Sequence, residues 1–239
     1  SYRFIGLSPV DGGPLFDDYS EQVDLLKNLN KYETFTTVLK PTGKRDPSMS
    51  GSVYNNFIWK RFRANLTLAY SLGAKLRQSR ILAQRPADDE NRFIYSEFNA
   101  NRALLNRWKA PGDEKNTIIP AIIGTNQSGY YAYNRHWTQQ GGYEGIIFAE
   151  TAWDMYDYCD ARVVSGNYLK CSNVSVAYVL PEKWLKTVRI SRFEATLSAT
   201  NLFTVCSKKL KGQTPTQSVF SQVQLSDRPT ISLGFNVSF

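Results

Sequence analysis

The sequence predicts an all-β fold, an antiparallel segment of a transmembrane β-barrel with long extracellular loops. Three observations lead to this prediction: apolar and polar residues alternate in several segments, the polar faces share one chemistry, and long connections alternate with short ones. The clearest segment is 230–239, where apolar side chains alternate with small or polar ones up to a terminal aromatic ring. A period of two is typical of a β-strand, because successive side chains point to opposite faces.

This closing strand is compatible with two folds. In a barrel wall the apolar face meets lipid and the small polar face lines the lumen. A half-buried strand of a soluble β-sandwich alternates in the same way. Segment 230–239 alone therefore leaves both folds open, and it has to be weighed together with the other segments.

Further segments that we predict as strands alternate in the same manner, some with a fault or two. They lie near 1–6, 51–60, 62–75, 167–180 and 188–202. Their polar faces carry mostly Ser, Thr, Asn and Ala rather than Lys and Glu. The solvent face of a soluble sheet usually carries more charge, whereas a hydrated lumen accepts small neutral groups. This chemistry favours the barrel.

The connections fall into two length classes. Long ones at 7–49, 76–166 and 205–229 alternate with short turns at Lys60–Arg61 and after Leu180. Membrane barrels combine short periplasmic turns with long extracellular loops in this way, and a soluble domain rarely needs such long connections. Counted back from a periplasmic C-terminus, the direction of every predicted strand agrees with this arrangement.

Composition limits the remaining function classes. The 239 residues carry a net charge of +8, a pI of about 9.3 and a mean hydropathy of -0.39. No apolar run approaches the about 20 residues of a membrane helix. A basic chain can bind nucleic acid, but its basic residues are scattered and no nucleic-acid-binding motif accompanies them. We therefore expect no nucleic-acid partner, and we keep that class only as a rival interpretation.

The residues that usually carry chemistry form no site pattern. Cys159, Cys171 and Cys206 are odd in number and lack the spacing of a zinc site, although a Cys159–Cys206 bridge stays possible. His136 is the single histidine, and we expect it at the surface. No phosphate-binding loop or nucleophile elbow occurs. We expect no enzyme, no cofactor and no metal.

Six segments carry distinctive motifs. In chain order they are GLSPVDGGPLF, DPSMSGSVYNNFIWKRFRANLTLAYSLGAKL, NRWKAPGDEKNTIIP, SGNYLKCSNVSVAYVLPEKWL, RFEATLSATNLF and RPTISLGFNVSF. Together they resemble hallmarks of the SusC/RagA family of TonB-dependent outer-membrane transporters. The resemblance covers residues 1–239, but only the C-terminal part of such a transporter. It implies roughly the last six strands of a plugged barrel of about 22 strands. The loop after Phe203 departs from the family, because it lacks the Gly-x-Asp-Pro-Glu sequence common there. A chain that begins at Ser1 without Met also reads as a piece of a longer protein.

The resemblance implies a function and a set of partners. Members import a glycan or a peptide into a Gram-negative, Bacteroidetes-like cell through the outer membrane. A SusD-like surface lipoprotein closes over the barrel, and the TonB complex supplies energy through parts that this chain lacks. The chain would supply barrel wall and extracellular loops. The alternative is a soluble β-sandwich that binds carbohydrate.

Two sets of residues are candidates for function. The first belongs to the long loop 76–166, whose aromatic and polar side chains could face substrate or lipoprotein. It comprises Arg107, Trp108, Asp113, Tyr130, Tyr131, Tyr133, Trp137, Trp153 and Tyr156. For any single residue we favour the plainer interpretation, that it packs the loop against itself. The second set is the C-terminal barrel-assembly signal of Leu233, Phe235, Val237 and Phe239.

Overall fold

The computed structural model divides the chain into two compact units. The loop unit consists of Ser1–Thr42 and Arg77–Val163, and the sheet unit of Gly43–Leu76 and Val164–Phe239. The structure describes residues 1–17, 23–81, 101–124, 127, 129–134, 151–185, 190–216 and 227–239. None of the helices in these residues combines the length and the apolar character that crossing a bilayer requires.

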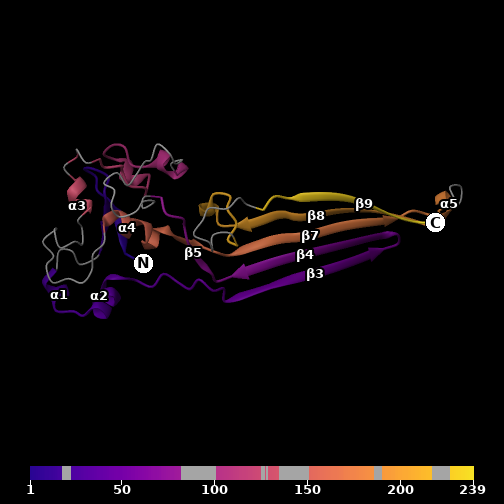
Figure 1. The fold of residues 1–239 in the computed structure, drawn as a ribbon, viewed down its shortest axis with the longest axis horizontal. Coiled ribbons are helices and arrows are strands. Elements are labelled where there is room, and N and C mark those ends of the chain that lie inside the picture. Colours follow the sequence, from indigo (N-terminus) through magenta and orange to yellow (C-terminus); the bar gives the residue numbers. More distant parts are fainter. Residues whose placement is uncertain are drawn as a thin grey trace. The chain divides into compact units, whose positions relative to one another are not determined.

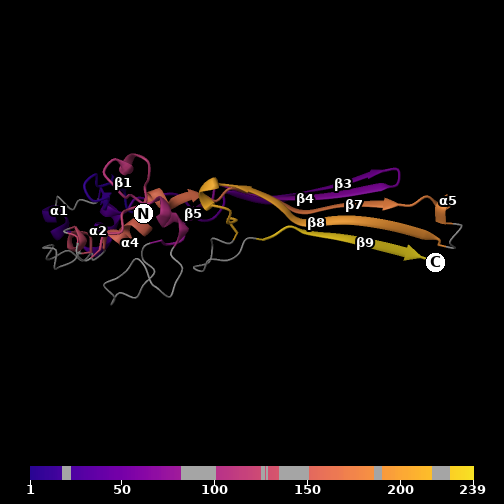
Figure 2. The ribbon, with the colours of Figure 1, turned by 90° about the horizontal axis from the view of Figure 1, so that it is seen from above.

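The sheet unit is built on a five-stranded antiparallel sheet. Its order is β3-β4-β7-β8-β9, and the strands run side by side in Figures 1 and 2. The strands are β3 (Met49–Trp59), β4 (Phe62–Leu72), β7 (Tyr168–Val179), β8 (Arg192–Cys206) and β9 (Thr230–Ser238). The sheet is open, with β3 and β9 at its two edges.

The connections within this sheet are short where the sequence predicts turns. Trp59 pairs with Phe62, so only Lys60 and Arg61 link β3 to β4. Lys60 adopts φ 53, the left-handed backbone conformation that two-residue hairpin turns favour. Between β7 and β8, the one-turn helix α5 (Glu182–Leu185) is the only helix or strand among the described residues.

Strand pairing gathers the apolar side chains on one face of the sheet. One row across all five strands consists of Leu233, Leu197, Val176, Ala64 and Phe57. The next row, on the opposite face, consists of Ser232, Ser198, Ser175, Asn65 and Asn56. The two faces therefore differ in the way that the alternation predicts.

Strand β8 runs further than the sequence indicates. We expected a strand over 188–202, but β8 spans Arg192–Cys206, and 188–189 lie outside the described residues. The extension follows a β-bulge, where the pairing jumps from Asn173↔Thr200 to Cys171↔Phe203. Asn201 in the bulge adopts φ 53, which Asn tolerates better than most residues. Asn201 and Leu202 thus lie opposite the single residue Ser172, and the bulge absorbs one extra residue so that pairing continues.

The loop unit contains secondary structure that the sequence did not predict. Segment 1–6 was expected as a further wall strand, but β1 (Phe4–Leu7) pairs with β2 (Pro14–Phe16) in a separate two-stranded sheet. A tight turn folds the chain back, because the N–H of Ser8 donates to the carbonyl of Gly13 at 2.8 Å. Connections 7–49 and 76–166 also hold α1 (Val23–Lys27), α2 (Lys31–Val38), η1 (Arg102–Asn106), η2 (Asp113–Lys115), α3 (Tyr130–Asn134), α4 (Ala152–Asp157) and η4 (Asp160–Arg162).

Three short elements complete the described structure. The strands β5 (Lys75–Arg77) and β6 (Val163–Ser165) form a second two-stranded sheet. The 3-10 turn η6 (Lys208–Leu210) follows β8 and buries Leu210.

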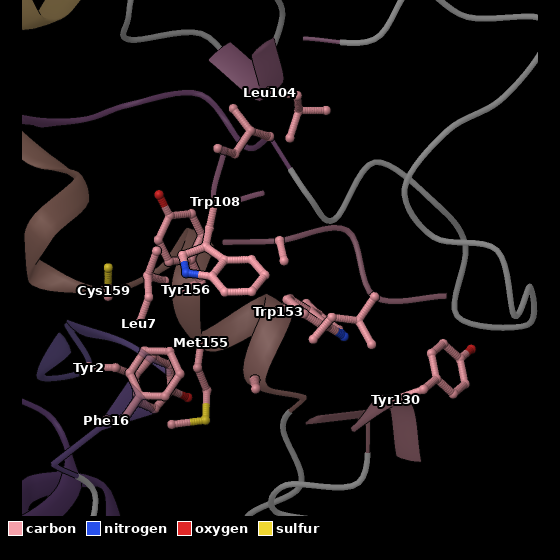
Figure 3. Packing of buried hydrophobic residues seen from close by; sticks show 14 of the residues in the cluster. Tyr2, Leu7, Phe16, Leu104, Trp108, Tyr130, Trp153, Met155, Tyr156 and Cys159 are labelled. Carbon is pink, nitrogen blue, oxygen red and sulfur yellow. The ribbon is translucent and has the colours of Figure 1, made fainter. Parts of the chain in front are cut away.

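The loop unit has a hydrophobic core of its own, centred on α4. Trp153, Met155 and Tyr156 are at most 1% exposed, and Figure 3 shows them with the other core side chains. The ring of Phe4 packs edge-on against Tyr156 at 5.7 Å and against Phe16 at 6.0 Å. The segments around β1, β2 and α4 therefore share one core despite their distance in sequence.

A buried ion pair fastens residues 79–81 to this core. The carboxylate of Asp157 lies 3.6 Å from the guanidinium Nε of Arg162, and both side chains are at most 5% exposed. Asp157 also accepts the N–H of Ile81 at 3.0 Å, and Arg162 donates to the carbonyl of Ser79. The pair thus provides hydrogen-bond partners for backbone groups that are held close to the core.

All three cysteines are free thiols. The Cys159–Cys206 bridge that the sequence left possible is therefore not formed. Burial raises the pKa of the Cys159 thiol to about 11, so this side chain is a protonated, apolar part of the core at neutral pH.

We predict that residues 1–239 do not insert into a membrane as a stable unit. Both β3 and β9 carry an unpaired edge, and lipid offers no partner for exposed backbone N–H and C=O groups. The isolated fragment, refolded in detergent, should show neither heat-dependent gel mobility nor protease resistance. A protease-resistant band at the size of the fragment would contradict this prediction.

We further predict that Asp157→Asn destabilises the loop unit, whereas Asp24→Asn does not. Loss of the Asp157 charge leaves Arg162 buried without its counter-ion, which costs roughly 3–5 kcal/mol. Asp24 pairs with Lys27 at an exposed helix surface, where such pairs contribute little. Thermal unfolding of the protein, followed by protease cleavage within the loop unit, measures the difference. Equal melting temperatures of the two variants would show that the buried ion pair contributes nothing to the stability of the loop unit.

Candidate functional site

The loop unit contains a pocket of about 520 Å³, which we call the Trp108 pocket. Its wall comes from the turn that joins β1 to β2 and from residues between η1 and α3. The lining residues are Val10, Asp11, Arg107, Trp108, Lys109, Ala121, Ile122, Ile123, Gln127 and Gly129. The pocket thus joins two segments that are about a hundred residues apart in the chain.

Trp108 is the structural anchor of this pocket. Its backbone N–H donates to the carbonyl of Ile119 at 2.9 Å, and its indole N–H donates to the carboxylate of Glu114 at 3.3 Å. The ring is 8% exposed and lies directly against Gly12, where a Cβ atom would come within 2.3 Å of it. Only glycine fits at this contact, and its φ of +72° is also one that other residues rarely adopt.

A tight acidic turn holds the residues after Trp108. The carboxylate of Asp113 accepts the N–H groups of Lys109 and Ala110 at 3.0 and 3.1 Å. Glu114 accepts the N–H of Gly112 at 2.7 Å. Backbone hydrogen bonds, first from its own N–H and then from Gly112, lower the pKa of Glu114 below its usual value. These bonds fix the backbone at Lys109, one rim of the pocket.

Asp11 also lines the pocket. Its Oδ1 atom accepts the N–H of Gly13 at 3.2 Å and the hydroxyl of Tyr133 at 2.8 Å. Burial, and then the hydrogen bond to Asp11, raises the pKa of Tyr133 to about 12. Tyr133 therefore stays protonated at neutral pH and remains a donor to Asp11.

The pocket holds more positive than negative charge. Arg107 and Lys109 line it together with the single carboxylate of Asp11. Arg107 donates one hydrogen bond, at 3.1 Å, to the carbonyl of Leu104. Within the described part of the chain, neither cation has an ion-pair partner among the bridges that the structure shows. Both can therefore interact with an anionic ligand.

The structure separates the residues predicted for this site into three groups. Arg107 and Trp108 line the pocket, and Asp113 and Tyr133 support it from behind. Tyr130, Trp153 and Tyr156 are core residues with exposures of 6%, 1% and 0%, so they offer no surface to a ligand. The side chain of Tyr131, Trp137 and the single histidine His136 lie outside the described residues.

Sequence reasoning missed half of the pocket. Asp11 lies outside the loop 76–166 on which the search for candidates concentrated, and Lys109 was one of many basic residues. The pair Gly12–Gly13 is the signal that could have found it. Both glycines lie where a Cβ atom would collide with an aromatic ring, Trp108 for the first and Tyr133 for the second.

No group of three or more His, Cys, Asp or Glu side chains in the described residues is placed to hold a metal ion.

Comparison with known proteins identifies structural relatives only. No protein-family model matches the chain, and a search of curated proteins finds no match. Among solved structures, the chain is similar over 100% of its length to the RagAB peptide importer in the 'open-open' state, at 18% identity and a TM-score of 0.53. It is also similar to the RagAB peptide transporter (19%, TM-score 0.59) and to the importer in the 'closed-closed' state (17%, 0.59). The chain spans 22% of the length of each, and the likeness shows a shared fold.

We predict that Gly12→Ala disrupts the Trp108 pocket, whereas Gly124→Ala leaves it intact. A methyl group at Gly12 would overlap the indole ring, while a Cβ at Gly124 meets nothing within 4 Å. Overpacking of this kind costs roughly 1–3 kcal/mol. The thermal midpoint of the loop unit, read by its resistance to protease, should fall only for Gly12→Ala. If both variants melt together, the tight contact with Trp108 has no structural role.

Proposed function

We propose that this chain is the C-terminal part of the barrel of a SusC/RagA-like outer-membrane importer. In this proposal it supplies barrel wall and extracellular loops for TonB-dependent uptake of a glycan or a peptide, together with a SusD-like lipoprotein. The observation that carries the proposal is the five-stranded sheet with one apolar and one small polar face. The similarity of the whole chain to RagAB importer structures supports it.

The exposed apolar face is the first support. Leu233, Leu197 and Phe57 belong to one row and are 63%, 52% and 64% exposed. Soluble proteins rarely expose an apolar surface that extends across five strands. Lipid is the partner that suits such a face, because a barrel wall alternates apolar and polar residues in this way.

Aromatic rings lie at the turn end of the same sheet. Trp59 stacks on Phe62 at 6.3 Å, and Phe62 contacts Tyr178 at 4.6 Å. Such rings prefer the headgroup level of a bilayer, where their edges meet water and their bodies meet lipid. We place this end of the sheet at the periplasmic surface of the membrane.

The polar face carries hydrogen bonds that cross the strands. Tyr54 donates to Asn65 at 3.1 Å, and Asn65 donates to Ser175 at 3.3 Å. Glu194 pairs with Arg63 and, at 2.9 Å, with Arg192. A water-filled lumen tolerates such polar and charged groups, whereas a lipid face does not.

The soluble β-sandwich has less support. That interpretation requires a second layer over the apolar face, with Phe235 and Phe239 buried. In the described residues Phe235 is 62% exposed and Phe239 is 92% exposed. We therefore propose Leu233, Phe235, Val237 and Phe239 as the closing strand's assembly signal.

Location and uptake in the native cell test the proposal directly. The parent protein should fractionate with the outer membrane and change gel mobility on heating, as folded barrels do. Its deletion should abolish uptake of one glycan or peptide mixture while uptake of small sugars through porins continues. A parent protein found in the soluble fraction would refute the proposal.

Two adjacent residues of β9 offer a sharper test of which face meets lipid. We predict that Leu233→Arg lowers the yield of folded parent protein in the outer membrane, whereas Ser232→Arg is tolerated. An arginine at the lipid-facing midplane costs about 2–4 kcal/mol, but one in the lumen stays hydrated. The heat-modifiable fraction of each variant measures the effect, and the opposite order would place lipid on the other face.

A further inference from the structure

We propose that the Trp108 pocket binds a carboxylate of a peptide, with Arg107 and Lys109 as the binding cations. This inference rests on the proposed import function and narrows its cargo to peptides that carry a free carboxylate. The carboxylate is either the C-terminus of the peptide or an Asp or Glu side chain. Apolar atoms next to it would lie against Val10 and Ile122.

The cations provide the first step of the argument. A guanidinium has five N–H donors in a planar fork, and Arg107 commits one of its nitrogens to the Leu104 carbonyl. The remaining donors suit the two oxygens of a carboxylate, and Lys109 on the same pocket wall adds a second positive charge. The Asp11 carboxylate, which would repel a ligand carboxylate, accepts two hydrogen bonds at its Oδ1 atom, from the N–H of Gly13 and the hydroxyl of Tyr133.

The apolar part of the wall provides the second step. Val10 is 81% exposed and Ile122 is half-buried, so these two lining residues offer apolar surface to a ligand. At about 520 Å³ the pocket has the size of a small-ligand site, for which about 300–1,000 Å³ is usual. Such a volume has room for the end of a peptide.

The buried ring of Trp108 argues against a glycan at this site. Sugar rings stack on exposed aromatic faces, but one face of Trp108 is covered by Gly12 and the ring is 8% exposed. The ring therefore acts as a packed support for the pocket. Charge, and not stacking, is what the pocket offers to a ligand.

Matched peptides test the proposal on the full parent protein, purified in detergent from the outer membrane. Two acetylated tetrapeptides end in leucine, one as the free acid and one as the amide. Two further amides carry glutamate or glutamine before the leucine. Calorimetry should show about tenfold tighter binding of at least one acid than of its neutral partner, since a charge-assisted hydrogen bond has about this effect. The two pairs distinguish a terminal from a side-chain carboxylate.

Charge-neutral variants then locate the site. Arg107→Gln and Lys109→Gln should each reduce the preference for the acid, and the double variant should abolish it. Lys109→Gln removes no hydrogen bond that its side chain makes within the described residues, so it tests charge without a folding defect. Arg102→Gln is the matched control, because it removes an exposed cation from η1 outside the pocket.

The outcomes separate this inference from the import function. Equal affinity for acid and amide, no binding of any peptide, or a preference that persists in the double variant would overturn the carboxylate site. Binding of a neutral maltooligosaccharide in place of the peptides would overturn it as well, although import would stand. A parent protein that is absent from the outer membrane would instead refute the import proposal, whatever the peptide affinities are.

Discussion

Strand register is the constraint on which the sheet unit depends. Because side chains alternate with a period of two, a slip of one residue in any pair would turn a whole strand over. The row from Leu233 to Phe57 and the row from Ser232 to Asn56 lie on opposite faces because all four strand pairs keep a matching register. The β-bulge between Cys171 and Asn173 takes up the extra residue of β8, so that the pairing of β7 with β8 continues. An apolar face and a polar face can coexist in a sheet one layer thick only under this condition.

The loop unit differs from the sheet unit, since its long connections are ordered with only short strands and helices. Its helices are short, and a helix of five to eight residues is not stable alone. Stability therefore comes from the shared core around α4 and from buried polar contacts such as Asp157 with Arg162. The ion pair contributes little through its charges alone, because desolvation offsets their attraction. Its value lies in satisfying backbone groups of residues 79–81 that a purely apolar core would leave without partners.

The sheet could be predicted because its signals are local in sequence. The loop unit was difficult to predict because its structure depends on contacts between distant segments. Alternation and a two-residue turn are both readable in a short window, so the strands at 51–60 and 230–239 agree with β3 and β9 within two residues. The partner of β1 depends on a turn at Gly12–Gly13 and on a core supplied by α4, far along the chain. The aromatic residues of loop 76–166 could be identified as a group, but composition does not distinguish a buried ring such as Tyr156 from one at a surface. Asp11 was missed because it lies far from Arg107 in the sequence, and only the fold brings both residues into one pocket.

The way in which the Trp108 pocket is held together allows its chemistry to vary. The bonds that shape it use backbone atoms: the N–H of Trp108 to Ile119, that of Lys109 to Asp113, and that of Ala121 to the carbonyl of Gly12. The side chains of Arg107 and Lys109 contribute almost nothing to this framework. A strand of the five-stranded sheet has no such latitude, since the register commits each of its residues to the apolar or to the polar face. Ligand chemistry can therefore change at the rim of the pocket without cost to the fold, and this is why we place specificity in the loop unit and not in the sheet.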